Sequence, residues 1–287
     1  SMAFDNGTAA VMNNPATLAM VRPGTIRFDL AVGRLGPNVN ASIATPQGAI
    51  SSASLSNAFY MPAFGLAAKR GKVTFGLGVF AQGGMGTEFG PTSWMSDPSQ
   101  GTNSALRTGL VNRSEVSVGR VLVPMSYDVT PRLRVGGTLD FIWAGMDLQM
   151  AMSESQFLDL ATTQTMGRVS GPIASAFAQM YEPFGGTGIS RLHHAYFDFS
   201  NDNAFTGQAR GTGFGGKLGA IYEISDVLSI GATFHSRTKI SDMTTTNATM
   251  SMGVNIDPAV LMGQAPSGQY VDFEIPVSGQ MAIRNFN

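Results

Sequence analysis

Cysteine is absent from this 287-residue sequence, and its absence removes three kinds of site at once. Without thiols there are no disulfide bonds, no thiolate metal ligands and no cysteine nucleophiles. Charge is also scarce, because only 13% of the residues are Asp, Glu, Lys or Arg. Soluble domains carry about twice that share, so the composition favours a protein whose surface meets a less polar environment than water.

The sequence also lacks a basic excess and a long apolar run. Its formal net charge is −1, and the Lys and Arg residues are dispersed along the chain. Proteins that bind nucleic acid carry a basic patch or stripe, so we expect no nucleic acid partner. No apolar run approaches the roughly 18 residues of a membrane helix. Strands of a transmembrane β-barrel give a much weaker signal, and a barrel is therefore not excluded.

What the sequence does contain is a repeated strand–turn–strand pattern. Residues 127–139 and residues 222–234 each begin with an aromatic residue that ends a strand, continue through a short polar turn and enter an alternating strand. A simpler copy spans residues 69–77. Alternation on both sides of a turn rich in Asp, Ser, Thr and Pro is typical of β-hairpins. The sequence therefore predicts an all-β, antiparallel fold.

The alternating segments predict about eight strands, which begin near Thr25, Asn57, Val73, Ser114, Leu133, Phe205, Leu228 and Tyr270. In the clearest of them the apolar residues face one way, whereas Arg134, Thr138 and Asp140 face the other. The apolar face would point at the core of a soluble sandwich or at the lipid around a membrane barrel, and periodicity does not separate the two.

Loop lengths favour the barrel. The turns near Gly71, Thr130 and Ser225 are short, and the connections at the other ends of the strands are long. Short turns at one rim and long loops at the other are typical of membrane barrels, whereas several long loops are unusual in a soluble domain. The long connections are residues 36–56, 83–113, 151–204 and 242–268.

The longest connection, residues 151–204, carries a helical pattern. After Pro172, apolar residues recur at helical spacing, so we expect a short amphipathic helix. One interpretation is a helix that caps the barrel. The other is an apolar landing surface for a ligand, because an apolar face on an exposed loop needs a partner. The residues of this candidate ligand-binding face are Ile173, Phe177, Met180 and Tyr181.

Two motifs invite an enzymatic interpretation, and neither supports one. Residues 211–217 are glycine-rich, but Leu218 stands where a phosphate-binding loop has Ser or Thr, and the segment leads into a strand instead of a helix. His193 and His194 are adjacent, and neighbouring side chains on an extended segment point in opposite directions, which is poor geometry for a metal site. We therefore expect no enzymatic activity, no metal site and no cofactor.

A resemblance to a known family rests on two segments. Asn14, Pro15 and Ala16 lie directly before the first strand, and residues 75–80 lead into Gly83-Gly84-Met85-Gly86. With these features the sequence resembles the FadL/TodX family of outer-membrane transporters for long-chain fatty acids and other hydrophobic compounds. The resemblance implies a fourteen-stranded barrel in the outer membrane of a Gram-negative bacterium, an N-terminal hatch that carries the Asn-Pro-Ala motif, and a third strand kinked at residues 83–86.

The chain departs from the family pattern in length, because it has about eight strands and a short hatch. We expect a fragment with a partial hatch at residues 1–23 and a barrel portion at residues 24–287. The resemblance implies passive uptake. A long-chain fatty acid or another apolar small molecule would land on the loop helix, displace the hatch and leave sideways at the kink into membrane lipid or detergent. A general porin and a structural or adhesive outer-membrane β protein remain as alternatives.

Overall fold

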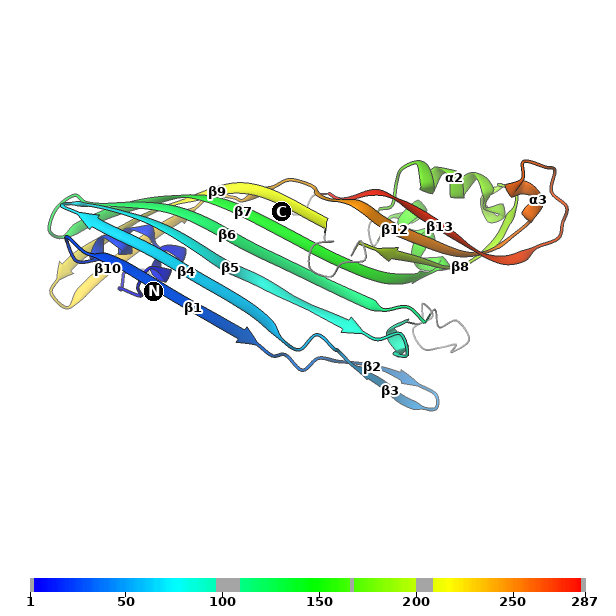
Figure 1. The fold of residues 1–287 in the computed structure, drawn as a ribbon, viewed down its shortest axis with the longest axis horizontal. Coiled ribbons are helices and arrows are strands. Elements are labelled where there is room, and N and C mark those ends of the chain that lie inside the picture. Colours follow the sequence, from blue (N-terminus) through cyan, green and yellow to red (C-terminus); the bar gives the residue numbers. More distant parts are fainter. Residues whose placement is uncertain (1–2, 97–108, 166–167, 200–208, 285–287) are drawn as a thin grey trace.

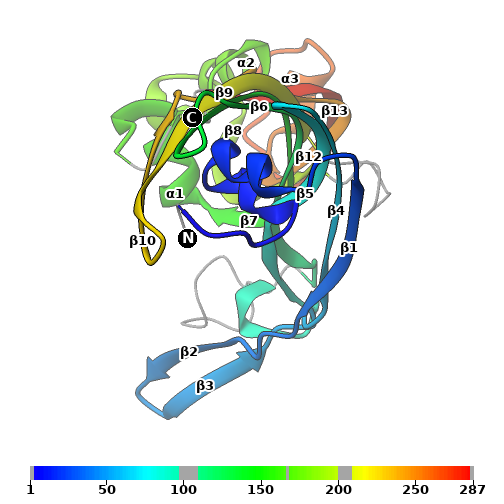
Figure 2. The ribbon, with the colours of Figure 1, turned by 90° about the vertical axis from the view of Figure 1, so that its left-hand side faces the viewer.

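A computed structural model describes residues 3–96, 109–165, 168–199 and 209–284 of the protein. One large antiparallel sheet dominates it (Figure 1). Seen along the strands, the sheet curls around the N-terminal helices into a trough, and it remains open between β1 and β10 (Figure 2). The predicted fold class, an antiparallel β-barrel architecture of the outer-membrane type, is confirmed, with a wall that is partly closed.

Most of the wall follows chain order. Neighbouring strands are hydrogen-bonded in antiparallel pairs from one edge to the other. In that order they are β1 (Ile26–Leu35), β4 (Phe59–Arg70), β5 (Val73–Phe89), β6 (Asn112–Asp128), β7 (Leu133–Ser153), β9 (Ala209–Ser225) and β10 (Leu228–His235).

Strand β7 changes its partner along its length. Its residues 133–146 pair with β9, and its residues 149–153 pair with β8 (Ile189–Asp198), so β8 and β9 lie end to end. Likewise β10, β11 (Lys239–Ile240) and β12 (Met243–Ile256) follow one another beside β9 and β8. Strand β13 (Val271–Ile283) pairs with β12. Counted this way, the described residues form the eight expected wall strands: β1, β4, β5, β6, β7, β8–β9, β10–β12 and β13.

The two ends of the trough differ. Tight turns at residues 71–72, 129–132 and 226–227 lie at one end, which we call the short-turn end. The other end, the long-loop end, carries α1 (Glu154–Leu158), the π-helical turn Asp159–Thr163, α2 (Pro172–Met180), the 3₁₀ turn Glu182–Phe184 and α3 (Pro258–Leu261) (Figure 1). The expected helix after Pro172 is thus present as α2. No helix within the described ranges is long and apolar enough to span a membrane.

The long connections contain more strand than the sequence predicted. Residues 189–198 and 243–256 were expected in loops and form β8 and β12, and β5 continues to Phe89. The connection 36–56 holds a hairpin of β2 (Asn40–Thr45) and β3 (Gly48–Ala53), and the 3₁₀ turn Trp94–Ser96 lies beside it. Strand β12 was missed because its Thr, Asn and Ser residues resemble a loop. The residues between them are buried in one apolar cluster: Met243, Ala248, Met250, Met252, Val254 and Ile256.

Side chains of the wall are distributed in the opposite way from those of a soluble protein. On β7, Leu139 is 76% exposed on the outer face, whereas Asp140 is 1% exposed on the concave face. An apolar exterior around a polar interior is typical of a β-barrel in lipid, and it rules out the soluble sandwich. Other exposed apolar residues of the outer face are Ile26, Phe28, Leu30, Phe75, Leu77, Val123, Met125, Phe141, Trp143, Phe214 and Leu218.

Substitution of Leu139 by Arg tests this assignment. We expect the variant to lose about 2 to 4 kcal/mol of stability in lipid, because the guanidinium would have to enter the hydrocarbon layer. The matched control is Val227→Arg in the turn between β9 and β10, where the side chain is 96% exposed and the change should stay within about 0.5 kcal/mol. Equilibrium unfolding by urea in phospholipid vesicles measures both, and equal effects would contradict a lipid-facing Leu139.

Candidate functional site

The N-terminal segment, residues 3–23, lies inside the trough at the short-turn end (Figure 2), and we call it the hatch. It consists of two 3₁₀ helices, η1 (Ala9–Met12) and η2 (Pro15–Met20). Asn14 caps η2, since its Oδ1 accepts the N–H of Ala16 at 3.0 Å, and Pro15 occupies the first helical position, where a missing N–H costs nothing. Asn14 and Ala16 are both 0% exposed, so the Asn-Pro-Ala motif is buried between the rest of the hatch and the wall.

Hydrogen bonds tie the hatch to several strands. The Asn14 amide nitrogen donates to the carbonyl of Ala220 on β9 at 3.1 Å. The ammonium group of Lys69 on β4 donates to the carbonyl of Ala19 at 2.5 Å, and it also forms an ion pair with Asp128 at 2.6 Å. Lys69 is 6% exposed, so both ends of η2 are held by groups shielded from water.

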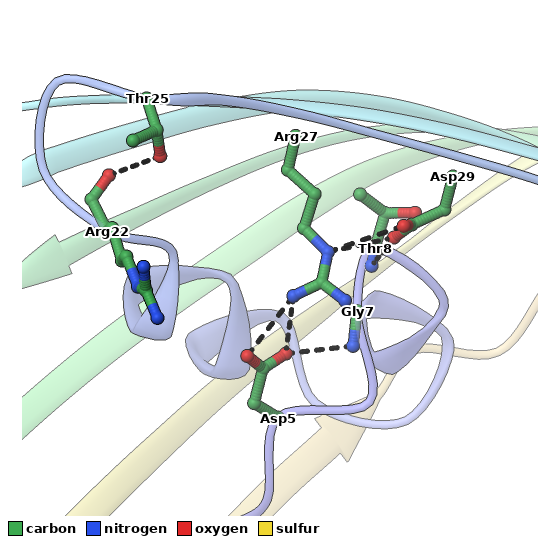
Figure 3. Close-up of polar contacts among 7 residues, drawn as sticks. All are labelled: Asp5, Gly7, Thr8, Arg22, Thr25, Arg27 and Asp29. Carbon is green, nitrogen blue, oxygen red and sulfur yellow. Dashed lines mark hydrogen bonds and ion pairs between the residues drawn. The ribbon is translucent and has the colours of Figure 1, made fainter.

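Strand β1 holds the beginning of the hatch through a chain of polar contacts (Figure 3). Arg27 forms ion pairs with Asp5 at 3.2 Å and with Asp29 at 3.1 Å. The N–H of Thr8 donates to Asp29 at 2.7 Å, and the N–H of Gly7 donates to Asp5 at 2.8 Å. The N-terminal part of the hatch therefore depends on charge, in contrast to the buried Asn-Pro-Ala motif.

A charged layer crosses the trough just beyond the hatch, toward the long-loop end. Asp140 on β7 contacts Arg120 on β6 at 2.8 Å and Lys217 on β9 at 2.9 Å. Asp140 and Lys217 are buried, and the Arg120 Nε has no hydrogen-bond partner among the described residues. Two cations share one carboxylate, so the layer has a positive excess of one charge.

A second charged cluster lies nearer the long-loop end, on the opposite face of the wall. Arg113 and Asp147 are each an odd number of residues from Arg120 and Asp140 in an unshifted register, so their side chains point to the other side of the sheet. Arg113 on β6 contacts Glu115 at 3.1 Å, Asp147 at 3.3 Å and Glu88 at 3.6 Å. Asp147 is 0% exposed. One guanidinium thus faces three carboxylates.

The wall is interrupted between β4 and β5. Pairing of these strands ends at Ala63 and Phe80, and a β-bulge follows, where the β5–β6 register shifts between Ala81 and Gly83. Beyond it, residues 59–62 of β4 stay paired with β1, and residues 83–89 of β5 stay paired with β6. We call this stretch, residues 59–62 and 81–87, the unpaired interval.

The predicted kink residues all lie in the unpaired interval. Gly83, Gly84, Met85 and Gly86 follow the bulge directly on β5. A Cβ added at Gly83 would meet no atom within 4 Å, so the strand borders open space there. The interval is closed toward the long-loop end by the N–H of Leu55, which donates to the carbonyl of Glu88 at 2.7 Å.

The predicted ligand-binding face of α2 is not an open surface. Phe177 is 3% exposed and Tyr181 is 2% exposed, and their rings stack at 4.9 Å. Phe157 packs edge-on against Phe177 at 5.4 Å, and the Tyr181 hydroxyl donates to Glu154 at 2.5 Å. Ile173 and Met180 are half-buried against the same apolar cluster. The helical periodicity was visible in the sequence, but the elements that cover the apolar face were not.

The prediction that the side chains of the adjacent histidines point in opposite directions was wrong. His193 is the extra residue of a β-bulge between β8 and β12, so both rings reach carboxylates of β13. His193 lies 3.0 Å from Asp272, and His194 lies 3.4 Å from Glu274. Even so, the part of the chain that the structure describes has no group of three or more His, Asp or Glu side chains placed to hold a metal ion.

The comparisons with known proteins agree with this architecture. Residues 1–285 match the family described as outer membrane protein transport protein (OMPP1/FadL/TodX). The chain belongs to this family. Membership places it in the outer membrane of a Gram-negative bacterium, and the family is one of transport proteins and not of enzymes. No curated protein matches the sequence.

Solved structures of the family share the fold. The Pseudomonas putida toluene transporter TodX is 25% identical with a TM-score of 0.75, and the alignment covers 100% of this chain and 61% of TodX. The CymD monoaromatic hydrocarbon channel is 22% identical with a TM-score of 0.63, and the alignment covers 100% of this chain and 58% of CymD. A Pseudomonas aeruginosa FadL homologue is 14% identical with a TM-score of 0.51, and the alignment covers 98% of this chain and 60% of the homologue. The chain therefore spans about three fifths of the length of these proteins.

Residues that sequence reasoning missed are mainly the inward-facing cations of this FadL/TodX family member. Arg120 and Lys217 occupy positions that alternate with outward apolar residues. A charged residue at an inward position of a lipid-facing strand was the available signal. Their convergence on Asp140 was not readable, because it depends on which strands are neighbours and in which register.

At the long-loop end a single carboxylate organises the segment after β12. Asp257 caps α3 by accepting the N–H of Ala259 at 3.0 Å, and it also accepts the N–H groups of Ser267 at 2.6 Å and Gly268 at 2.8 Å. Burial would raise the pKa of the Asp257 carboxyl, but the hydrogen bonds from Ser267, Ala259 and Gly268 outweigh it and hold that pKa below its ordinary value. These bonds favour the ionised form.

This lowered pKa predicts the pH dependence of the loop. The stabilisation from Asp257 is fully present above the ordinary pKa of 3.8 and is lost as the pH falls through the lower folded value. Hydrogen exchange, corrected for intrinsic rates, should show constant protection of the Ser267 and Gly268 amides between about pH 7 and pH 5, and a loss below about pH 4. Asp257→Asn should abolish this dependence, whereas the control Asp226→Asn at the short-turn end should keep it. Unchanged protection down to about pH 2 would contradict the assignment.

Proposed function

We propose that the protein takes up hydrophobic compounds passively and releases them sideways through the wall. The observation that carries the proposal is the unpaired interval between β4 and β5, which lies beside a trough whose short-turn end is filled by the hatch. In lipid an unpaired backbone group costs several kcal/mol, so irregular backbone persists there only where it lines a cavity or is covered by protein. An interruption in an otherwise continuous wall fits an exit for cargo.

The orientation follows from the loops. Outer-membrane barrels have short periplasmic turns and long extracellular loops, so the long-loop end is assigned to the outside and the hatch to the periplasmic side. A compound entering from outside meets the loop region with α2 first, then the charged layer around Asp140, and finally the hatch. The axial path ends there, because η2 contacts β6, β7 and β9.

Lateral exit suits an apolar cargo physically. A compound that leaves through the unpaired interval passes from the trough into the bilayer and does not cross the aqueous periplasm. Glycine at residues 83, 84 and 86 keeps the edge of β5 free of large side chains. The hatch is proposed to shift when cargo arrives, since its N-terminal part is held by exposed ion pairs with Arg27 that are weak compared with buried contacts.

The entry surface has to be placed differently from the sequence prediction. Phe177 and Tyr181 hold α2 against the loop cluster, because both are buried. Ile173 and Met180 are half-buried on the same helix and are the positions that an arriving ligand can reach first. Met is flexible and polarisable, which suits contact with apolar ligands of varied shape.

The ligand class is proposed from the positive layer. Arg120 and Lys217 share Asp140, and an anionic head group could use the excess charge, so we favour a long-chain fatty acid. Neutral aromatic hydrocarbons are the second candidate. Two of the similar solved proteins are described as a toluene transporter and a monoaromatic hydrocarbon channel, and each aligns over about three fifths of its own length.

Gly83→Phe tests the exit. The new side chain has room, since a Cβ at this position meets nothing within 4 Å, and it would project at the edge of the unpaired interval. We expect the uptake rate of a radiolabelled apolar compound by cells to fall, while equilibrium binding to detergent-solubilised protein stays unchanged. The matched control is Gly279→Phe on β13, where a Cβ also meets nothing within 4 Å.

Three outcomes separate the alternatives. Equal uptake by the Gly83→Phe variant and the Gly279→Phe control contradicts lateral exit. Uptake of small hydrophilic solutes in proportion to their size supports a general porin. An absence of saturable uptake of any apolar compound leaves a structural or adhesive role.

Lys217→Met tests the ligand class. The variant keeps the Arg120–Asp140 pair and removes the positive excess, so a carboxylate loses its electrostatic attraction. We expect affinity for a long-chain fatty acid to fall by about tenfold, near the 1 to 3 kcal/mol of a charge-assisted hydrogen bond, with little change for its methyl ester. Tryptophan fluorescence titration in detergent measures both, and equal losses for acid and ester would favour a neutral hydrocarbon as cargo.

A further inference from the structure

Two glycines of neighbouring strands form the floor on which the hatch motif rests. Gly136 on β7 and Gly219 on β9 are direct cross-strand partners in the antiparallel register. Both belong to the inward set of positions, since Thr138 and Lys217, the next partners on that face, are buried on the concave side. The pair therefore leaves a patch of the wall without side chains, directly below Asn14, Pro15 and Ala16.

Asn14 fits the half of the patch made by Gly219. A Cβ added at Gly219 would lie 2.0 Å from the Oδ1 of Asn14 and 3.0 Å from both its Cγ and the Cδ of Pro15. Contacts under 3.0 Å do not occur for real Cβ atoms. The Asn14 side chain is also fixed in this place, because it donates to Ala220 and accepts from Ala16. Rotation away from a new methyl group would break both hydrogen bonds.

The other half of the patch receives backbone. A Cβ at Gly136 would lie 2.7 Å from the Ala16 nitrogen, 2.7 Å from the Pro15 carbonyl carbon and 2.8 Å from the Pro15 oxygen. No rotamer change can relieve an overlap with main-chain atoms. The whole η2 helix would have to move away from β7, and with it the contacts of Leu18 and Ala19 with the wall.

Most other wall glycines with no room for a Cβ lie against a neighbouring strand and not against the hatch. A Cβ at Gly213 would meet the backbone of Lys239, and a Cβ at Gly216 would meet the carbonyl of Thr138. Gly65 on β4 resembles the pair, because its Cβ would lie 1.9 Å from the Thr8 Oγ1, but Thr8 lies outside the Asn14-Pro15-Ala16 segment. Gly136 and Gly219 stand apart because they touch the Asn-Pro-Ala segment and lie directly opposite each other.

We propose that the Gly136–Gly219 pair is the receptor for the Asn14-Pro15-Ala16 motif and determines whether the hatch is seated. The two glycines act as positioning residues, and a side chain at either one works as a wedge that holds the hatch away from the wall. The seated state depends here on shape and backbone approach, and not on the ion pairs that hold the N-terminal part of the hatch. This inference rests on the proposed hatch function and names the part of the wall that controls it.

The experiment measures seating separately from transport. Because the sequence has no cysteine, an Ala10→Cys reporter gives the protein a single thiol at a hatch position that is 1% exposed. Maleimide labelling of this thiol in vesicles follows the population of the unseated hatch. Gly136→Ala and Gly219→Ala should each raise the labelling rate by at least about tenfold. The control Gly33→Ala on β1, whose Cβ would meet only Met61 at 3.8 Å, should leave it unchanged.

A variant on the hatch side guards against misfolding of the wall. Asn14→Ala leaves every strand untouched, removes the contact with Gly219 and should raise labelling in the same way. Combined with Gly219→Ala, it should add little, since residues that act in one contact are not additive. Unchanged labelling in all three single variants, with barrels that remain folded by heat-dependent gel mobility, would overturn the proposal, as would full additivity in the double variant.

The same variants distinguish this inference from the proposed function. Faster labelling together with altered uptake of apolar compounds supports both. Faster labelling with unchanged uptake supports the Gly136–Gly219 pair as the receptor and contradicts hatch displacement as a step of transport. Unchanged labelling with altered uptake contradicts the role of the glycine pair and leaves the transport proposal standing.

Discussion

Backbone hydrogen bonding in a medium without water is the constraint on which the rest of this structure depends. Every peptide group that crosses the bilayer needs a partner within the protein, and the continuous ladders from β1 to β10 supply one for most of the wall. The interruption between β4 and β5 is therefore significant. The two strands separate after Phe80, while β4 stays paired with β1 and β5 stays paired with β6. An interruption of this kind costs free energy in lipid, and it lies at the proposed exit.

The same constraint explains why polar groups collect inside. Charged side chains on the outer face would enter hydrocarbon, so Asp140, Arg120 and Lys217 turn inward and compensate one another. Next to them the hatch is seated by two different means. Its beginning is held by the ion pairs of Arg27 with Asp5 and Asp29, which water and salt weaken. Its Asn-Pro-Ala segment is held by close backbone approach to glycine, which salt does not affect. Salt therefore weakens the first contact and leaves the second unchanged.

Much of this organisation could be predicted from residues alone. Alternation on β7 fixed the strand and its two faces, and the tight turns near Gly71, Thr130 and Ser225 identified the short-turn end. The helix after Pro172 followed from apolar spacing. Prediction failed where a local pattern has two meanings. The Thr-rich strand β12 was taken for a loop. Of the two interpretations of the apolar face of α2, the exposed landing surface does not fit, because Phe157 and Phe177 cover each other in a closed cluster.

The sequence by itself determined the class of fold and its environment, because strand period, turn chemistry and scarcity of charge are local properties that each segment carries alone. Only the tertiary structure decided which inward residues meet. Asp140 shares its two cations, and Gly136 faces Gly219, because β7 pairs with β9 in one register. A slip of β9 by one residue against β7 would turn Lys217 and Gly219 toward the lipid. Register between strands about 80 residues apart in sequence is a property of the whole sheet, and so the Gly136–Gly219 pair and the charged layer became visible only with it.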